Sequence, residues 1–193
     1  MVNLELMDLL WYAAPVIALG ILGVAFAYLY NRLYRYSNAA DANLGQIRVA
    51  LKKRLDMIEQ LLGAVRGYIQ HEREVFERIA EMRARLFEGG TGEISEIERE
   101  SRGITVSVMA VAEDYPELKA NETVRKLMVA IVSVEDEIAR HRYTFNNIVQ
   151  EFNTMVDTIP SNLIARAVGH EKLEYLQFEE PLEVPEVKVK PGN

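Results

Sequence analysis

The chain has 193 residues, of which 49% are hydrophobic, with 11 glycines, 6 prolines, no cysteine and a formal net charge of −7. The negative charge argues against a nucleic-acid-binding protein, because phosphate contacts need a surplus of Lys and Arg. The absence of cysteine excludes disulfide frameworks, thiolate metal sites and thiol nucleophiles, and the low glycine and proline content favours helix over strand. We therefore expect an all-α fold.

An uncharged run extends from Leu9 to Tyr30 and contains no Asp, Glu, Lys or Arg. About 20 apolar residues in a helix match the ~30 Å hydrocarbon layer of a bilayer. The run therefore predicts a single transmembrane helix at about residues 9–30, within an N-terminal membrane anchor of residues 1–36. A cleaved signal peptide is disfavoured, because Glu5 and Asp8 precede the run and the run is too long.

Aromatic and basic residues flank this run in the pattern of a membrane interface. Tyr and Trp rings favour the headgroup depth, and Lys and Arg accumulate on the cytoplasmic side. The residues that we predict at the interface are Trp11, Tyr12, Tyr28, Tyr30, Arg32 and Arg35. We expect the lipid bilayer as a partner, at the cell membrane, with the N-terminus outside and the body of the protein in the cytoplasm.

Apolar residues recur every three or four positions through the rest of the chain, which predicts amphipathic helices. The expected helices span about residues 41–87, 94–111 and 124–159, followed by a short segment at 162–169. The second is expected to break at 114–117, which contains Pro116; Asn121 begins the third, and Pro160 ends it. A glycine-rich turn at 88–92 ends the first helix and is expected to lie farthest from the membrane. Three facing stripes joined by short turns predict a long antiparallel helical bundle over residues 37–170.

The remaining residues, 171–193, form an acidic, proline-containing C-terminal tail. From Glu179 onward the tail is too rich in Pro, Glu and Lys to bury a core, which predicts disorder. An alternative is that Val187 and Val189 dock the tail on a neighbour as an extended peptide.

Two charged residues interrupt the apolar stripe of the third predicted helix. Glu135 and Arg142 occupy positions where leucine or isoleucine would be expected, and buried charges need partners. Glu72 is one candidate partner. Three interpretations remain open: a polar layer that fixes the register of the bundle, a contact surface for another subunit, or a small-ligand site.

The sequence contains no convincing catalytic or metal-binding pattern. His71 has no second histidine at helical spacing, Glu137 and His141 form only a helix-face pair, and no Glu-x-x-His motif is present. No nucleophile motif surrounds any serine, and the glycine-rich turn lacks the lysine of a phosphate-binding loop. We therefore expect no catalytic residue, no metal and no cofactor.

Several stretches resemble the LemA family. The most specific is AEDYPELKAN at Ala112–Asn121, which includes Tyr115, Pro116 and Asn121 as candidate interaction residues. Similar stretches are 46–54, 65–68, 143–146 and 160–165. The chain departs from the family pattern at Glu59-Gln60 and at Val168-Gly169-His170, where the family carries Pro-Asn and a glycine with an aromatic residue; the second departure puts in doubt a docking role for that aromatic position.

The resemblance implies an N-terminal anchor and a cytoplasmic antiparallel bundle, without an accepted catalytic activity. It also implies associations with membrane-bound protease systems, envelope stress and, in magnetosome relatives, membrane shaping. The chain is thus expected to be a non-enzymatic single-pass scaffold or adaptor that forms a homo-oligomer with coiled-coil-like packing and contacts a membrane protein such as a membrane protease.

Self-association is expected because apolar residues also lie outside the main stripes. They are Val49, Leu61, Tyr68, Val106, Met109, Met128, Val132 and Met155. The alternative is a helical-bundle sensor that binds a small ligand outside the membrane and signals through partners.

Overall fold

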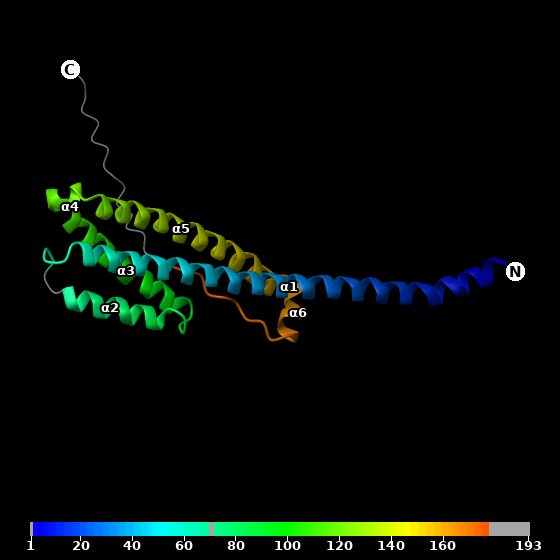
Figure 1. Cartoon of the computed structure of the whole chain (residues 1–193). Coiled ribbons are helices and arrows are strands. Elements are labelled where there is room, and N and C mark those ends of the chain that lie inside the picture. Colours follow the sequence, from blue (N-terminus) through cyan, green and yellow to red (C-terminus); the bar gives the residue numbers. More distant parts are fainter. Residues whose placement is uncertain (1, 70–71, 178–193) are drawn as a thin grey trace, which may run out of the picture.

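The computed structural model describes residues 2–69 and 72–177, and these residues form helices and connecting segments without a strand. The helices are α1 (Val2–Ala64), α2 (Glu72–Arg85), α3 (Thr91–Asp114), α4 (Pro116–Ala120), α5 (Glu122–Asp157) and α6 (Ser161–Ala167). The expected all-α fold, a long N-terminal helix followed by an antiparallel bundle, is confirmed (Figure 1).

Helix α1 has 63 residues and runs without a break from the apolar N-terminal run into the bundle (Figure 1). At ~1.5 Å per residue it is about 95 Å long. None of the side chains from Trp11 to Tyr28 is buried. In the described part of the chain, α1 alone contains a segment that is long and apolar enough to cross a membrane. Its C-terminal half is the helix around which the bundle packs.

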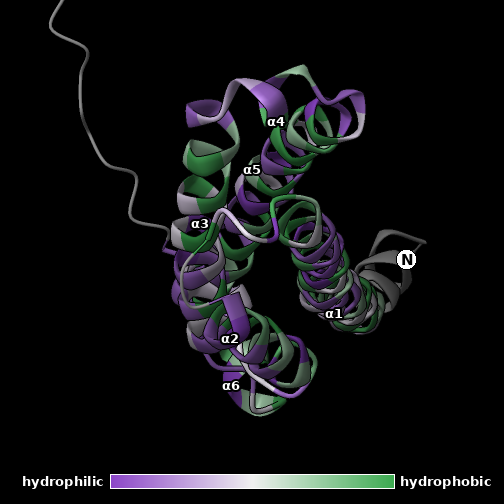
Figure 2. Ribbon diagram, turned by 60° about the vertical axis from the view of Figure 1, so that its left-hand side comes forward, coloured by the Kyte–Doolittle hydropathy of each residue, from purple (hydrophilic) through white to green (hydrophobic). Residues whose placement is uncertain are grey.

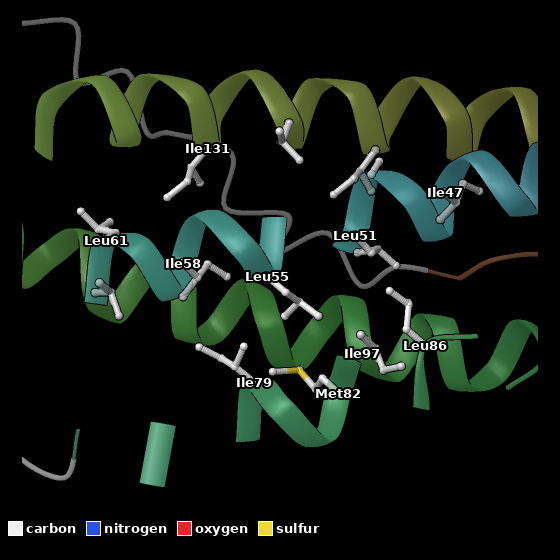
Figure 3. Packing of buried hydrophobic residues seen from close by; sticks show 14 of the residues in the cluster. Ile47, Leu51, Leu55, Ile58, Leu61, Ile79, Met82, Leu86, Ile97 and Ile131 are labelled. Carbon is white, nitrogen blue, oxygen red and sulfur yellow. The ribbon is translucent and has the colours of Figure 1, made fainter. Parts of the chain in front are cut away.

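The prediction of one helix over residues 41–87 is wrong, because α1 ends at Ala64 and α2 begins at Glu72. Gly67 in the connection has a φ of 95°, a left-handed conformation that glycine adopts without a steric penalty. Helix α2 then turns back along α1. Its apolar residues Ile79 and Met82 therefore still reach the common core beside α1 (Figure 3).

This reversal also changes the position of the glycine-rich turn. We expected the turn at 88–92 to lie farthest from the membrane, but Arg48 Nη2 in the middle of the bundle donates a hydrogen bond to the Gly89 carbonyl at 2.8 Å. The end of the bundle opposite the apolar run is instead formed by the connection after Ala64 and by α4.

The core lies between α1, α3 and α5, with α2 on one side. Each of these helices carries hydrophobic and hydrophilic stripes (Figure 2). Helix α5 packs antiparallel along α1 and supplies Ile131, Val134 and Ile138 to the main cluster. Leu61 is buried in this interior and Met155 in a smaller second cluster, so the expectation that they lie on an exposed contact stripe is wrong.

The predicted ends of the second and third helices are confirmed. Helix α3 ends at Asp114, before Pro116, which starts the short α4. The Asn121 side chain caps α5 by accepting hydrogen bonds from the backbone N–H groups of Thr123 at 2.9 Å and Val124 at 3.3 Å. Helix α5 ends at Asp157, just before Pro160.

Residues 170–177 follow α6 and run back along α5 without helical structure (Figure 1); we call them the strap. They extend the packed body seven residues beyond the predicted bundle limit at 170. The residues for which disorder was predicted, from Glu179 onward, lie outside the described residues.

Candidate functional site

A fully buried arginine occupies the centre of the bundle. Arg54 of α1 has 0% relative exposure, although its neighbours Lys52 and Lys53 are exposed. It lies three residues after Leu51 and four before Ile58, both of which are buried, and positions three and four apart share one helix face. The packing of α1 therefore places its guanidinium group against α3 and α5.

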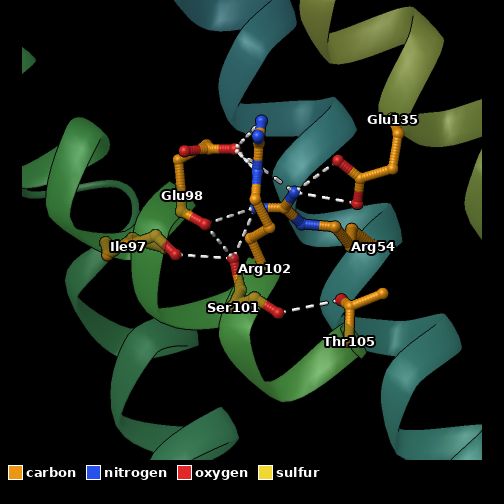
Figure 4. Close-up of polar contacts among 7 residues, drawn as sticks. All are labelled: Arg54, Ile97, Glu98, Ser101, Arg102, Thr105 and Glu135. Carbon is orange, nitrogen blue, oxygen red and sulfur yellow. Dashed lines mark hydrogen bonds and ion pairs between the residues drawn. The ribbon is translucent and has the colours of Figure 1, made fainter. Parts of the chain in front are cut away.

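Two helices supply the acceptors for this guanidinium group (Figure 4). Arg54 Nη1 donates to both Glu135 carboxylate oxygens at 2.9 and 2.8 Å. Arg54 Nη2 donates to the Glu98 carbonyl at 2.8 Å and to Ser101 Oγ at 2.6 Å. Three helices, α1, α3 and α5, therefore meet at one side chain.

The cluster is balanced in charge. The Glu98 carboxylate, which is 2% exposed, lies 3.6 Å from Arg54 Nη1 and pairs with Arg102 at 2.7 Å. Two arginines thus face two glutamates, which avoids the large cost of an unpaired buried charge. Ser101 Oγ in turn donates to the Ile97 carbonyl at 2.5 Å (Figure 4). We call Arg54, Glu98, Ser101, Arg102 and Glu135 the arginine cluster.

The arrangement of the cluster is suited to a structural role. Arginine stays protonated in proteins, so Arg54 is neither a general acid nor a general base. Its position in the closed interior also keeps its charge away from water, and the two hydrogen bonds from Nη1 to the Glu135 carboxylate join α1 to α5.

The structure separates the three charges that the sequence singled out. Glu135 joins Arg54, whereas Glu72 begins α2 and pairs with Arg66 at 3.0 Å. Arg142 is half-buried two turns further along α5. In the sequence, Arg54 has the simpler explanation of being one of the basic residues that follow the anchor, with Lys52 and Lys53. Its spacing from Leu51 and Ile58 was the signal that could have revealed its burial.

Tyr115, Pro116 and Asn121 lie together at the end of the bundle remote from the apolar run. The Tyr115 ring packs against Tyr68 with a centroid distance of 4.6 Å, and the Tyr68 hydroxyl donates to Glu117 at 3.3 Å. Partial desolvation raises the pKa of Tyr68, and the neighbouring Glu117 carboxylate raises that pKa further. These contacts join the connection after α1 to α4, while Pro116 and Asn121 begin helices.

Two asparagines of α5 hold the strap. Asn153 accepts a hydrogen bond from the Leu173 N–H and donates to the Leu173 carbonyl, both at 2.9 Å. Asn146 makes the same pair of bonds with Leu176, at 2.9 Å and 3.0 Å. The asparagines lie two helical turns apart, and each binds the backbone of the strap as a neighbouring strand would.

The predicted interface residues lie on both sides of the exposed apolar run of α1. Trp11, Tyr12 and Tyr28 are exposed, and Tyr30 is half-buried. The Arg32 guanidinium group lies 5.6 Å from the Tyr36 ring centroid and 3.8 Å from Glu151 of α5, while Arg35 is exposed. The bundle therefore begins immediately where the apolar run ends.

A small second core closes this end of the bundle. Leu33 packs with Phe152 and Met155 of α5 and with Ala165 of α6. The His170 ring makes edge contacts with Tyr34 at 4.9 Å and Phe152 at 5.5 Å. The His170 ring therefore packs against the side of this second core.

Comparison with known proteins points to a family for this chain. The LemA family profile matches residues 43–189. Protein LemA of Metamycoplasma hominis is 26% identical over 153 residues, which are 78% of this chain and 70% of that protein.

Two magnetosome proteins match a shorter region. Magnetosome protein MamQ 2 of Paramagnetospirillum magneticum is 33% identical over 70 residues, 36% of this chain and 26% of that protein. Magnetosome protein MamQ of Magnetospirillum gryphiswaldense is 31% identical over 68 residues, 35% of this chain and 25% of that protein. The chain thus spans about a quarter of these relatives. Because the family profile covers well over half of its residues, the chain belongs to the LemA family.

Proposed function

We propose that this protein is a non-enzymatic, single-pass membrane scaffold whose bundle associates with a second copy and with membrane proteins. One observation carries the proposal: α1 passes without interruption from an exposed apolar segment into the centre of the bundle. A single helix that serves both as membrane anchor and as core helix couples the bundle rigidly to the bilayer.

The contacts near the end of the apolar run support this coupling. Leu29 and Leu33 pack against α5 and α6, so no linker separates the span from the body. A flexible linker would let a tethered domain move relative to its anchor, whereas the continuous helix α1 holds the bundle at a fixed position. A scaffold benefits from a fixed position above the membrane.

The charge asymmetry supports a cytoplasmic body. Arg32 and Arg35 follow the span directly, and short basic segments stay on the cytoplasmic side. Lys119 lies exposed on α4, at the end of the bundle remote from the span, and is suited to a topology test. Because the chain has no cysteine, Lys119→Cys provides a single labelling site.

We expect Lys119→Cys to resist a membrane-impermeant maleimide in intact cells and to react after lysis. Asn3→Cys is the reciprocal control and should react in intact cells. Labelling of Lys119→Cys in intact cells would contradict the cytoplasmic orientation and favour the extracellular sensor.

Self-association is proposed to use the outer face of α5. Val132 and Tyr143 are exposed and lie three helical turns apart on one face, with Val129 one turn before Val132. A membrane-protein partner such as a membrane protease would use the same kind of apolar surface. Monomeric relatives of this architecture would be expected to place polar residues there.

We expect Val132→Glu to reduce the oligomer mass of the full chain in lipid nanodiscs, measured by light scattering. Ser133→Glu, at the next exposed position of α5, is the matched control and should leave the mass unchanged. A wild-type chain that is monomeric at high concentration would contradict the proposed self-association.

A further inference from the structure

The end of the bundle beside the span exposes two large apolar side chains. Ile159, in the connection between α5 and α6, is 82% exposed, and Leu163 of α6 is 63% exposed. Ala167 is also exposed and lies four residues after Leu163, on the same face of the helix. The opposite face of α6 is buried through Ile164 and Ala165.

The ion pair between Arg32 and Glu151 shows how far along α1 this end of the bundle reaches. Their side chains lie 3.8 Å apart, and α5 runs antiparallel to α1. Beyond Glu151, α5 continues for six residues to Asp157, about 9 Å at ~1.5 Å per residue. Six residues back from Arg32 along α1 is Phe26, inside the apolar run.

The contacts of the second core independently place this end of the bundle at the same position along α1. Met155 and Ala165 pack with Leu33, and Leu29 packs against the same cluster. Ile159 lies one turn beyond Met155, in the direction of the apolar run. The end of the bundle is therefore level with the last turns of the predicted span and does not stand clear of them.

The orientation of α6 matches this position. The short helix α6 lies across α1, whereas α2 and α5 follow the direction of α1 (Figure 1). If α1 crosses the bilayer near its normal, α6 lies along the bilayer surface. At that depth, Ile159 and Leu163 reach the boundary between headgroups and acyl chains.

We propose that residues 158–167 form a second membrane contact, in which Ile159 and Leu163 insert into the headgroup region of the bilayer that α1 spans. This inference rests on the proposed membrane anchoring of α1. The occupant of the exposed apolar face is the lipid surface, because the apolar run that needs the hydrocarbon layer is level with it.

The charges around this face indicate that apolar contact, rather than electrostatic attraction, supports the docking. Arg166 and Glu171 are both exposed, and Lys172 neutralises Asp157 at 2.7 Å. The positive and negative charges around this face are therefore nearly equal in number. We therefore expect the contact to form on neutral phosphatidylcholine as well as on membranes that contain phosphatidylglycerol.

Fluorescence quenching in vesicles tests this inference on the full chain. Single cysteines at Ile159 and Leu163 are labelled with an environment-sensitive nitrobenzoxadiazole probe and reconstituted in phosphatidylcholine vesicles. Separate vesicles contain nitroxide lipids with the spin label either near the headgroup or near the bilayer centre. Ala18→Cys reports the span, and Lys119→Cys reports the remote end of the bundle.

We expect the probes at Ile159→Cys and Leu163→Cys to shift to the blue and to be quenched more strongly by the shallow nitroxide. The probe at Ala18→Cys should be quenched more strongly by the deep nitroxide, and the probe at Lys119→Cys by neither. Circular dichroism of each variant checks that helix content is unchanged.

The remaining outcomes separate the two proposals. Quenching at Ala18→Cys with solvent-like probes at Ile159→Cys and Leu163→Cys overturns the second contact and leaves the anchor intact. A blue shift at Leu163→Cys without lipid quenching also overturns it, because protein then covers the face. No quenching at Ala18→Cys refutes the membrane anchor and the second contact together.

Discussion

In the arginine cluster, the buried ion pairs and hydrogen bonds between the helices converge on the Arg54 side chain. Removing Arg54 leaves the Glu98 carboxylate, which is 2% exposed, with only part of its compensating charge. Breaking a buried ion pair by removing one partner typically costs about 3–5 kcal/mol. The loss of bonds to Glu135 and Ser101 adds to the same effect.

We predict that Arg54→Met lowers the free energy of unfolding by about 3 kcal/mol, measured by chemical denaturation with circular dichroism in detergent. Lys53→Met is the matched control: Lys53 is exposed and its pair with Glu137 at 3.1 Å lies at the surface, so less than about 1 kcal/mol should be lost. Equal losses in both variants would show that Arg54 has no special structural role.

A substitution of Glu135 tests which of the three interpretations of the charges in the apolar stripe of α5 holds. Glu135→Leu removes two hydrogen bonds from the Arg54 guanidinium group, and bonds to charged groups contribute about 1.5–3 kcal/mol. We predict a loss of about 2 kcal/mol in unfolding free energy with the oligomer mass unchanged. Asp136→Leu, at the exposed neighbouring position, should change stability by less than about 0.5 kcal/mol.

A change in oligomer mass on Glu135→Leu without a loss of stability would favour the subunit-contact interpretation instead. The sequence identified Glu135 because a charge interrupted an apolar stripe. It did not identify Arg54, because a basic residue just beyond a span has an equally simple explanation as part of the positive-inside pattern. Only the packing of three helices distinguishes the two explanations.

At the scale of elements, the strap depends on two asparagines of α5. Each asparagine makes two hydrogen bonds to one strap residue, at about 1 kcal/mol per bond. The Leu176 side chain is also buried, so the strap closes part of the main core. The bonds and the apolar contact together keep the strap on α5.

We predict that Asn153→Ala speeds amide hydrogen exchange at Leu173 by about 30-fold, which corresponds to the loss of two bonds of about 1 kcal/mol each. Asn146→Ala should do the same at Leu176. Asn147→Ala removes an exposed amide from α5 and is the control that should leave both rates unchanged. Exchange that is unaffected by Asn153→Ala would mean that apolar packing alone holds the strap.

The helices also show what the apolar periodicity of the sequence does not predict. The stripe over 41–87 predicted one helix, and its buried positions were largely correct, since Ile47, Ile79 and Leu86 are all in the core. A helix that doubles back presents the same face to the same core as a helix that continues. Periodicity therefore identifies the buried residues but does not identify the reversal at Gly67.

At the scale of the whole molecule, helix α1 carries both the apolar run and part of the bundle core, but the side chains of the run lie outside that core. No side chain from Trp11 to Tyr28 is buried in the chain itself, whereas Leu33 is fully buried in the second core. The run therefore adds no buried side chain to the bundle, and its length and composition fit a membrane anchor.

We predict that a chain beginning at Tyr28 stays soluble and loses less than about 1 kcal/mol of unfolding free energy, because it removes no described side chain that is buried. A chain beginning at Gly45 is the comparison. It removes Leu33 and Ala40 from the two cores and should unfold at clearly lower denaturant concentration. Similar midpoints for the two truncations would contradict the division between run and bundle.

The sequence by itself determined the helical class, the membrane-length run, the ends of the second and third helices and the family. These features rest on local chemistry: the side-chain period, the absence of charge, Pro116 and Pro160, the Asn121 cap and the AEDYPELKAN stretch.

Only the tertiary structure decided that α2 turns back, that Arg54 lies inside the bundle, that two asparagines hold the strap and that α6 is level with the end of the apolar run. Each of these depends on contacts between residues far apart in the chain, such as Arg54 with Glu135 and Leu33 with Ala165. Local periodicity does not contain such contacts, because the free energy that selects them comes from packing and charge pairing between helices.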